Sequence, residues 1–148
     1  MLQFDFYIFA PDMNNTRFAT VVHILTLLAR QPNRLLSSDW IAGSININPV
    51  IVRKELGNLQ DRGWVISRKG KDGGSMLDVS PDRITLADIY QLVKNANILG
   101  KKNLDTNPKC SVGKDINDEL EALFRDTDKL ICSSLQQKTL QDFVKQFD

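Results

Sequence analysis

Residues 37–65 read SSDWIAGSININPVIVRKELGNLQDRGWV, and this stretch decides the fold. Asn48 followed by Pro49 predicts a helix start, because Asn caps free N–H groups and Pro suits the first helical turn. The helix is expected to run to about residue 62, with Gly63 as a left-handed stop. Three apolar residues at helical spacing give it a buried face: Val52, Leu56 and Leu59.

A shorter helix is predicted just before this one. Ser38 is interpreted as its N-cap, and the three residues that follow Asp39 are expected to turn inward: Trp40, Ile41 and Ala42. Residues 45–47 are all that remains between the two helices. A turn of about three residues is typical of a helix-turn-helix unit.

A two-stranded wing is predicted directly after the second helix. Residues 64–66 and 76–79 are strand formers, and between them RKGKDGGS at 68–75 crowds glycines and cations into a turn. On the other side of the unit, apolar residues at helical spacing over 16–30 predict a core helix. Thr85 with Asp88 is a pair typical of a capping box and opens a further helix.

One long helix is expected near the C-terminus, followed by a final short helix capped by Thr139 with Asp142. Its apolar face is longer than a domain of this size needs, so it either packs back on its own domain or pairs with its copy in a two-fold dimer. The second interpretation explains the excess length. The residues predicted at that interface are Val112, Ile116, Leu120, Leu123, Phe124 and Ile131.

The predicted fold is mainly α (α+β), a winged helix-turn-helix with a long C-terminal dimerisation helix. Residues 1–12 are interpreted as an extension or tag-like segment, and 13–94 as the DNA-binding domain. Residues 95–110 form a loop, and 111–148 carry the dimerisation helix and the C-terminal helix. A chain of 148 residues is about one ordinary domain.

Composition excludes several classes of function. The chain has 42% hydrophobic and 25% charged residues, which is ordinary for a globular protein and argues against disorder. Its single histidine and two cysteines without a CxxC motif support neither a metal site nor a catalytic triad, so no cofactor and no enzymatic activity are predicted. No apolar run reaches the roughly 18 residues of a membrane span, and a cytoplasmic protein is expected.

A mildly basic front half favours a polyanion partner. Residues 13–94 hold 11 Lys and Arg against 7 Asp and Glu. A helix that begins with Asn48 and carries Arg53 and Lys54 can enter a major groove, where Val50 could touch a thymine methyl group. The alternative for these two cations is a solvated helix face.

The wing favours DNA binding over a merely solvated helix face, because three cations lie on its glycine turn: Arg68, Lys69 and Lys71. These side chains could reach an adjacent minor groove or its phosphates, although a plain hairpin with charged tips has the same composition. A short turn, a capped helix and a basic wing in succession are more specific than any one of them. Together they predict binding to double-stranded DNA.

These residues resemble a known family. The runs TRFATVVHILTLLA, KGKDGG and DRITLADIY, with the stretch 37–65, are similar to the Rrf2 family of bacterial transcription regulators, the IscR, NsrR and CymR type. The resemblance implies a homodimer that binds pseudo-palindromic operators and mostly represses. It also implies DNA contacts at Ser38, Asn48, Val50 and Arg53. Lys69 stands where many members have an arginine, which leaves the sequence preference of the wing open.

The loop before the long helix, which senses the signal in iron-sulfur members of the family, departs from the family pattern in this chain. Iron-sulfur members carry three cysteines in the loop before the long helix, and this loop retains only Cys110, so no iron-sulfur cluster is predicted. Cys110 is either a redox-sensing thiol, favoured by Lys109 and the nearby helix N-terminus, or an inert residue. Cys132 is interpreted as a buried small hydrophobe.

The predicted function is a sequence-specific DNA-binding regulator without a metal. The competing hypothesis is a dimeric protein-interaction adaptor that uses the same fold without binding DNA. A small-molecule effector is undefined by the sequence.

Overall fold

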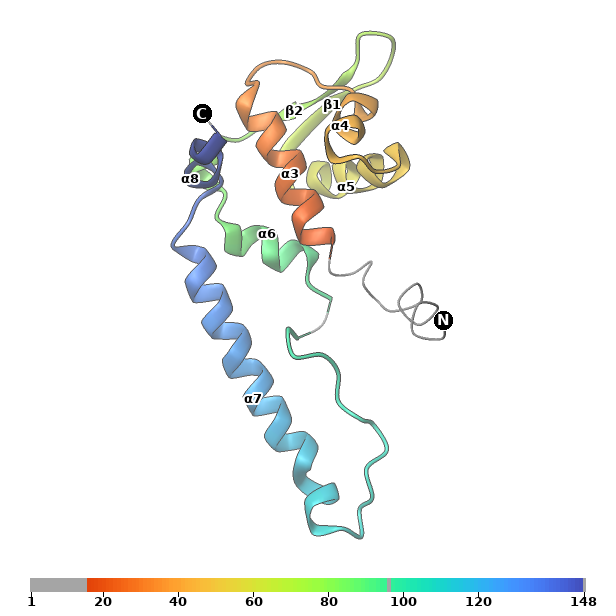
Figure 1. The fold of residues 1–148 in the computed structure, drawn as a ribbon, viewed down its shortest axis with the longest axis vertical. Helices are drawn as coiled ribbons and strands as arrows, with labels where there is room; N and C mark the ends of the chain where they lie inside the picture. Colours follow the sequence, from red (N-terminus) through yellow and green to blue (C-terminus); the bar gives the residue numbers. More distant parts are fainter. Residues whose placement is uncertain (1–15, 96, 148) are drawn as a thin grey trace.

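The computed structural model describes residues 16–95 and 97–147, so the predicted extension at 1–12 lies outside the described residues. The elements follow one another as drawn in Figure 1. Their bounds are α3 Arg17–Arg30, α4 Ser38–Ile45, α5 Pro49–Asp61, β1 Val65–Arg68, β2 Gly74–Leu77, η1 Pro81–Arg83, α6 Leu86–Val93, α7 Ser111–Gln136, α8 Leu140–Val144 and η2 Lys145–Phe147.

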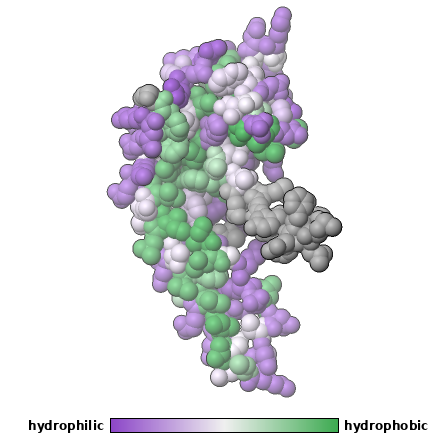
Figure 2. All heavy atoms as spheres, viewed as in Figure 1, coloured by the Kyte–Doolittle hydropathy of each residue, from purple (hydrophilic) through white to green (hydrophobic). Residues whose placement is uncertain are grey.

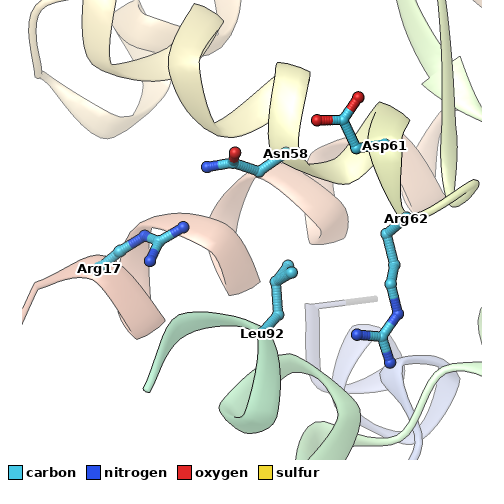
Figure 3. Close-up of a pocket in the computed structure, with 5 residues that line it drawn as sticks. All are labelled: Arg17, Asn58, Asp61, Arg62 and Leu92. Atoms are coloured by element: carbon cyan, nitrogen blue, oxygen red, sulfur yellow. The ribbon is translucent and has the colours of Figure 1, made fainter. Parts of the chain in front are cut away.

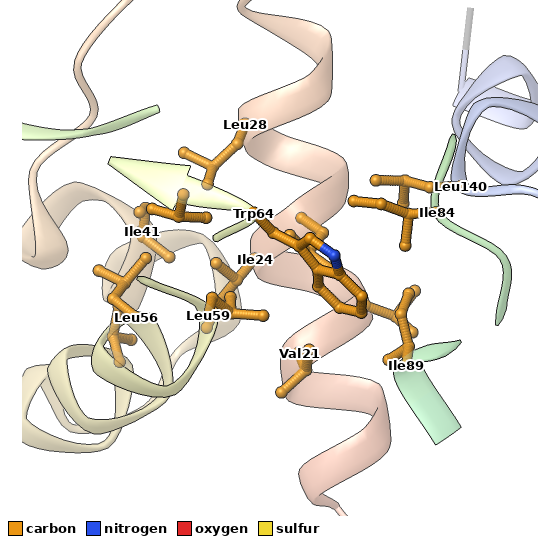
Figure 4. Close-up of a cluster of buried hydrophobic side chains, with 14 of the residues drawn as sticks. Val21, Ile24, Leu28, Ile41, Leu56, Leu59, Trp64, Ile84, Ile89 and Leu140 are labelled. Carbon is orange, nitrogen blue, oxygen red and sulfur yellow. The ribbon is translucent and has the colours of Figure 1, made fainter. Parts of the chain in front are cut away.

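Helix α3 is the centre of the core, as its apolar periodicity predicted. Val21, Ile24, Leu25 and Leu28 are fully buried on it. Figure 4 shows side chains from α4, α5, α6 and α8, together with Trp64 and Ile84, gathered around this helix. The hydroxyl of buried Thr26 donates a hydrogen bond to the Val22 carbonyl one turn earlier. This polar group therefore has a hydrogen-bond partner inside the core.

The helix-turn-helix unit has a turn of the predicted length, one residue later than the predicted 45–47. Helix α4 ends at Asn46 in the left-handed conformation with φ 65°, which an Asn side chain tolerates. Asn48 then caps α5, and its side chain accepts a hydrogen bond from the Val50 N–H at 2.9 Å. Residues 46–48 therefore join the two helices, and Pro49 opens α5 as expected.

Two details of α4 were predicted wrongly. The N-cap is Ser37, whose hydroxyl accepts from the Trp40 N–H at 3.1 Å, and Ser38 is the first helical residue. Trp40 does not turn inward, because its side chain is exposed. The predicted inward pair, Ile41 and Ala42, is buried. A local pattern of two serines does not tell which of them takes the extended cap conformation.

The wing is an antiparallel pair in which Val65 lies opposite Leu77 and Arg68 opposite Gly74. Its second strand is also joined to the segment before α4. The Leu36 N–H donates to the Ser75 carbonyl at 2.9 Å, and the Ser75 N–H donates to the Leu36 carbonyl at 2.8 Å. Both strands of the wing are thus joined to the helix-turn-helix unit, β1 through the chain that follows α5 and β2 through the segment before α4.

The C-terminal elements return to the core. Both predicted capping boxes are present, at Thr85 with Asp88 and at Thr139 with Asp142. Leu140 of α8 is fully buried beside α3, whereas α7 extends away from the body of the molecule (Figure 1). Within residues 16–95 and 97–147, no helix combines the length and the apolar character needed to cross a membrane.

Candidate nucleic-acid interface

Helix α5 turns one face into the core and the other to solvent. Its buried face is formed by Val52, Glu55, Leu56 and Leu59. On the outer face Val50, Ile51, Arg53 and Lys54 are exposed, together with the cap residue Asn48. The side chains predicted to enter a major groove therefore share the solvent-facing surface of one helix, and the Arg53 side chain is 56% exposed.

Arg53 reaches from α5 to the first turn of α4. Its Nη1 donates to the Ser38 hydroxyl at 3.4 Å and lies 4.0 Å from the Asp39 carboxylate. Two residues predicted as DNA contacts, Ser38 and Arg53, are thus neighbours although they are 15 positions apart. Asp39 was missed, because an acid beside a DNA-facing cation gives no distinctive pattern in sequence.

A partly buried ion pair links the inner face of α5 to α3. Arg17 Nε donates to Glu55 Oε2 at 2.8 Å, and Arg17 Nη2 donates to Glu55 Oε1 at 3.0 Å. Asn58 donates a further hydrogen bond to Glu55 Oε1 at 3.0 Å. The Glu55 side chain is 5% exposed, and its hydrogen bond to Arg17 raises the pKa of the guanidinium. This bidentate geometry fixes the orientation of α5 as well as its distance from α3.

Arg17 also borders a small polar pocket behind α5. The pocket has a volume of about 300 Å³ and is lined by Arg17, Asn58, Asp61, Arg62 and Leu92. Figure 3 shows Leu92 of α6 pointing toward the space between Arg17 and Arg62. The Arg62 guanidinium stacks over the Trp64 ring at 4.9 Å from its centroid. These contacts connect the C-terminal end of α5 to the core beside the wing.

The wing presents its predicted cations to solvent. Arg68, Lys69 and Lys71 are all exposed. The turn needs its glycines, because Gly70 has φ 104° and a Cβ at Gly73 would lie 2.1 Å from the Arg68 carbonyl oxygen. The backbone of the tip can therefore approach another surface closely with three cations around it.

Helix α7 exposes an apolar stripe. Ile116, Leu123 and Leu130 recur every seven residues along it, and Leu130 is 72% exposed. Of the predicted interface residues, Val112 and Leu123 are exposed, and Ile116, Leu120 and Ile131 are half-buried. Phe124 is 7% exposed within the single chain, so most of its side chain is covered without a partner. Leu130 was not predicted, although its heptad spacing would have found it.

Apolar surface continues from α7 onto the body. Figure 2 shows a band of apolar residues that runs along α7 and over the helices above it. A mainly apolar groove of about 440 Å³ lies between α3 and the C-terminal segment. Its lining residues include Phe18, Val22, Leu27, Phe143 and Phe147.

A polar joint connects α6 to α7. Asp128 accepts hydrogen bonds from the Tyr90 hydroxyl at 2.8 Å and from the Lys94 ammonium. Lys94 lowers the pKa of Asp128, and burial together with the Asp128 hydrogen bond raises the pKa of Tyr90 to about 12. One turn further, Gln91 Nε2 donates to Cys132 Sγ at 2.9 Å. Cys132 is half-buried and hydrogen-bonded, which corrects its interpretation as a buried hydrophobe.

Cys110 is exposed and is the N-cap residue of α7, so it lies at the helix N-terminus that was expected near it. Backbone N–H groups of Gly113 and Val112 lower the pKa of its thiol, because they stabilise the thiolate. The helix N-terminus is therefore the physical cause of the lowering.

A helix that enters from a three-residue turn with a basic hairpin beside it is the arrangement of winged helix-turn-helix proteins. Comparison with known proteins narrows the class. Residues 14–146 match the family described as "Rrf2: Iron-dependent Transcriptional regulator". The chain belongs to the Rrf2 family of transcriptional regulators, which confirms the resemblance found in the sequence.

Individual relatives agree with this assignment. The chain is 35% identical over 132 residues to YwnA of Bacillus subtilis, named as an HTH-type transcriptional regulator, covering 89% of this chain and 97% of YwnA. A transcriptional regulator from Lactobacillus plantarum has a TM-score of 0.72 at 27% identity, with 86% and 87% of the two chains covered. CymR, the global cysteine regulator of B. subtilis, has a TM-score of 0.63 at 25% identity, with 90% and 96% covered.

The family description mentions iron, and the residues present can be tested against an iron site. Across residues 16–95 and 97–147, no group of three or more His, Cys, Asp or Glu side chains is placed to hold a metal ion. Cys110 directly precedes α7, whereas Cys132 lies in its C-terminal part. The described residues of one chain therefore do not fit an iron or iron-sulfur centre.

Proposed function

We propose that the protein is a sequence-specific DNA-binding repressor that acts in the cytoplasm as a homodimer on a two-fold operator. Residues 13–94 form the DNA-binding domain in this proposal, 95–110 a connecting loop, and 111–148 the dimerisation part. The observation that carries it is the outward-facing Arg53 on a capped helix beside the basic wing.

The two basic surfaces have different roles in the proposal. Asn48, Val50 and Arg53 contact base edges in the major groove, because they lie on the exposed face of α5. Lys54 and Ser38 contact the adjacent backbone. Arg68, Lys69 and Lys71 bind phosphates or a minor groove beside it, since a tight glycine turn carries them.

The test is a binding selection from random duplexes, followed by affinity measurements on the selected duplex and on random DNA. Arg53→Ala is expected to weaken the selected duplex by about 1–3 kcal/mol and to relax preference at one position. Lys71→Ala serves as the matched control, because a phosphate contact weakens all duplexes alike and lowers the salt dependence by about one charge per contact. Failure of the wild type to select any duplex favours the adaptor hypothesis.

Dimerisation through α7 is proposed from its apolar stripe. Val112, Ile116, Leu120, Leu123 and Ile131, with Leu130 added, give one helix face more apolar surface than its own chain covers. A two-fold pair would cover this face and present two DNA-binding domains to successive turns of the duplex.

Sedimentation of wild type and Leu123→Glu tests the dimer. The variant is expected to sediment as a monomer at concentrations where the wild type is a dimer, because a carboxylate would be buried in the seam. Lys129→Glu is the control, since Lys129 is an exposed polar residue on the same helix. Wild-type protein that sediments as a monomer would contradict the proposal.

Control by oxidation of Cys110 is part of the same proposal. Its exposure and its lowered thiol pKa support a reactive thiolate. The test compares operator affinity before and after mild peroxide treatment in wild type and Cys110→Ser. An unchanged affinity in the wild type removes the thiol from the mechanism.

A further inference from the structure

Asp39 occupies an unusual position for an acid. It is the second residue of α4 and its side chain is 82% exposed, on the same side of the molecule as Arg53. The first turn of this helix is where a helix-turn-helix unit approaches the DNA backbone, and an exposed carboxylate there repels phosphates. In the proposed complex, Asp39 is therefore expected to lower general affinity for DNA.

The contact of Asp39 with Arg53 gives this acid a positive role. Ser38 and Asp39 both approach Nη1 of the Arg53 guanidinium, at 3.4 Å and 4.0 Å. Among the described residues, no hydrogen bond or ion pair involves Arg53 Nε or Nη2. The edge that carries these two nitrogens is left free, and a two-pronged edge is what guanine O6 and N7 accept.

The back of α5 supports the same geometry. Glu55 lies two positions after Arg53 on the opposite face and is held by two hydrogen bonds from Arg17. Helix α5 is thus anchored to α3 through its buried face, while Nη1 of Arg53 on the other face lies beside Ser38 and Asp39 of α4. A long Arg side chain otherwise loses much rotamer freedom when it binds a base.

We infer that Asp39 is a specificity-determining residue, which holds the Arg53 guanidinium toward a guanine edge and disfavours its contact with phosphates. The inference rests on the proposed function, in which Arg53 reads a base. Neutralising Asp39 then has two effects of opposite sign. It removes a charge that repels phosphates, and it frees Arg53 to bind the backbone in place of the base.

The experiment measures two affinities for each variant: one for the duplex selected by the wild type, and one for the same duplex with the guanine opposite Arg53 replaced by adenine. The guanine is identified as the position at which Arg53→Ala loses preference. Asp39→Asn is expected to bind the replaced duplex severalfold more tightly than the wild type does. Its preference for guanine is expected to fall about tenfold, the scale of one bidentate base contact.

Asp72→Asn is the matched control, because it removes an exposed acid from the wing turn without touching Arg53. It is expected to tighten both duplexes alike and to keep the preference. In the Arg53→Ala background, Asp39→Asn is expected to leave the remaining preference unchanged. Circular dichroism confirms that each variant is folded.

The outcomes separate the inference from the proposed function. If Asp39→Asn behaves like Asp72→Asn while Arg53→Ala still loses preference, the inference is wrong and the proposed function stands. An unchanged preference in Arg53→Ala removes Arg53 as the reader and overturns the inference. If the wild type selects no duplex, both are wrong.

Discussion

Helices α3 and α7 show two ways of using apolar residues. Helix α3 has 14 residues and buries seven of them in the chain's own core. Helix α7 has 26 residues and buries one, Phe124. Its remaining apolar residues lie on an exposed or half-buried stripe. The winged helix-turn-helix part is thus stabilised by its own contacts, whereas the long helix leaves most of its apolar face exposed or half-buried in the single chain.

The largest expected effect is on the free energy of unfolding, which a truncation in the core lowers far more than a truncation on α7. Leu59→Ala is expected to lower the free energy of unfolding by about 2–5 kcal/mol, because Leu59 is fully buried and its truncation leaves a cavity. Leu130→Ala is expected to change the same quantity by less than about 0.5 kcal/mol in dilute solution, because Leu130 is exposed in the single chain. Urea unfolding followed by fluorescence measures both.

Repeating the urea experiment at high protein concentration sharpens the comparison. Wild type is expected to become more stable with concentration and Leu130→Ala less so, since association stabilises the folded state by mass action. Equal concentration dependence in the two proteins would show that Leu130 is not covered by a partner.

The second effect concerns the ion pair that anchors α5. Arg17→Met is expected to cost about 2–3 kcal/mol of unfolding free energy, less than a fully buried pair because Arg17 is 31% exposed. The double variant Arg17→Met with Glu55→Leu is expected to recover most of this loss, since it leaves no unpaired buried carboxylate. A double variant as unstable as the single one would show that packing of Arg17, and not its charge, is what matters.

A third prediction tests the joint where the two regions meet. Because burial and Asp128 raise the pKa of Tyr90 to about 12 from its ordinary 10.0, folding favours the protonated phenol. Its contribution to stability is fully present below about pH 10 and is lost as the pH rises toward 12. Ultraviolet titration of phenolate, with Tyr90→Phe for assignment, is expected to show Tyr90 ionising late. Asp128→Asn is expected to shift this ionisation to lower pH.

The smallest expected effect is a difference in reactivity between the thiol of Cys110, at the N-terminus of α7, and the thiol of Cys132. Cys110 in a Cys132→Ser variant is expected to react with iodoacetamide severalfold faster at neutral pH than Cys132 does in Cys110→Ser. The reason is that the lowered pKa of Cys110 increases its thiolate fraction, and Cys110 is also the more exposed thiol. In denaturing urea the two rates are expected to converge, and a difference that persisted there would have another cause.

Capping and turn rules, which depend on residues close in sequence, predicted much of the winged helix-turn-helix part. The Asn48–Pro49 start of α5, the three-residue turn, the two capping boxes and the wing all depend on residues close in sequence, and the structure confirms them. Ser38 failed as an N-cap because Ser37 offers the same chemistry one position earlier. A choice between adjacent residues of one type depends on the chain's tertiary course.

The missed features are tertiary pairs. Arg17 and Glu55 are 38 positions apart, and neither has a local signature of its own. A signal existed, because Glu55 lies at the i+3 position from Val52 on the apolar face of α5, where a carboxylate needs a buried partner. Phe124 is buried within the single chain, a burial that the sequence analysis did not anticipate, because helical periodicity alone does not show which apolar residues of α7 the same chain covers.

The paired hydrogen bonds between Leu36 and Ser75 have a mechanical consequence. They join β2 to the segment that leads into α4, so the hairpin and the helix-turn-helix unit are connected at a second place besides the link from α5 to β1. Under the proposed function, the basic tip and helix α5 are therefore expected to keep one spacing on a half-site. The proposed dimer is then expected to adapt to operators of different length outside this pair, for example where Tyr90 and Lys94 of α6 contact Asp128 of α7.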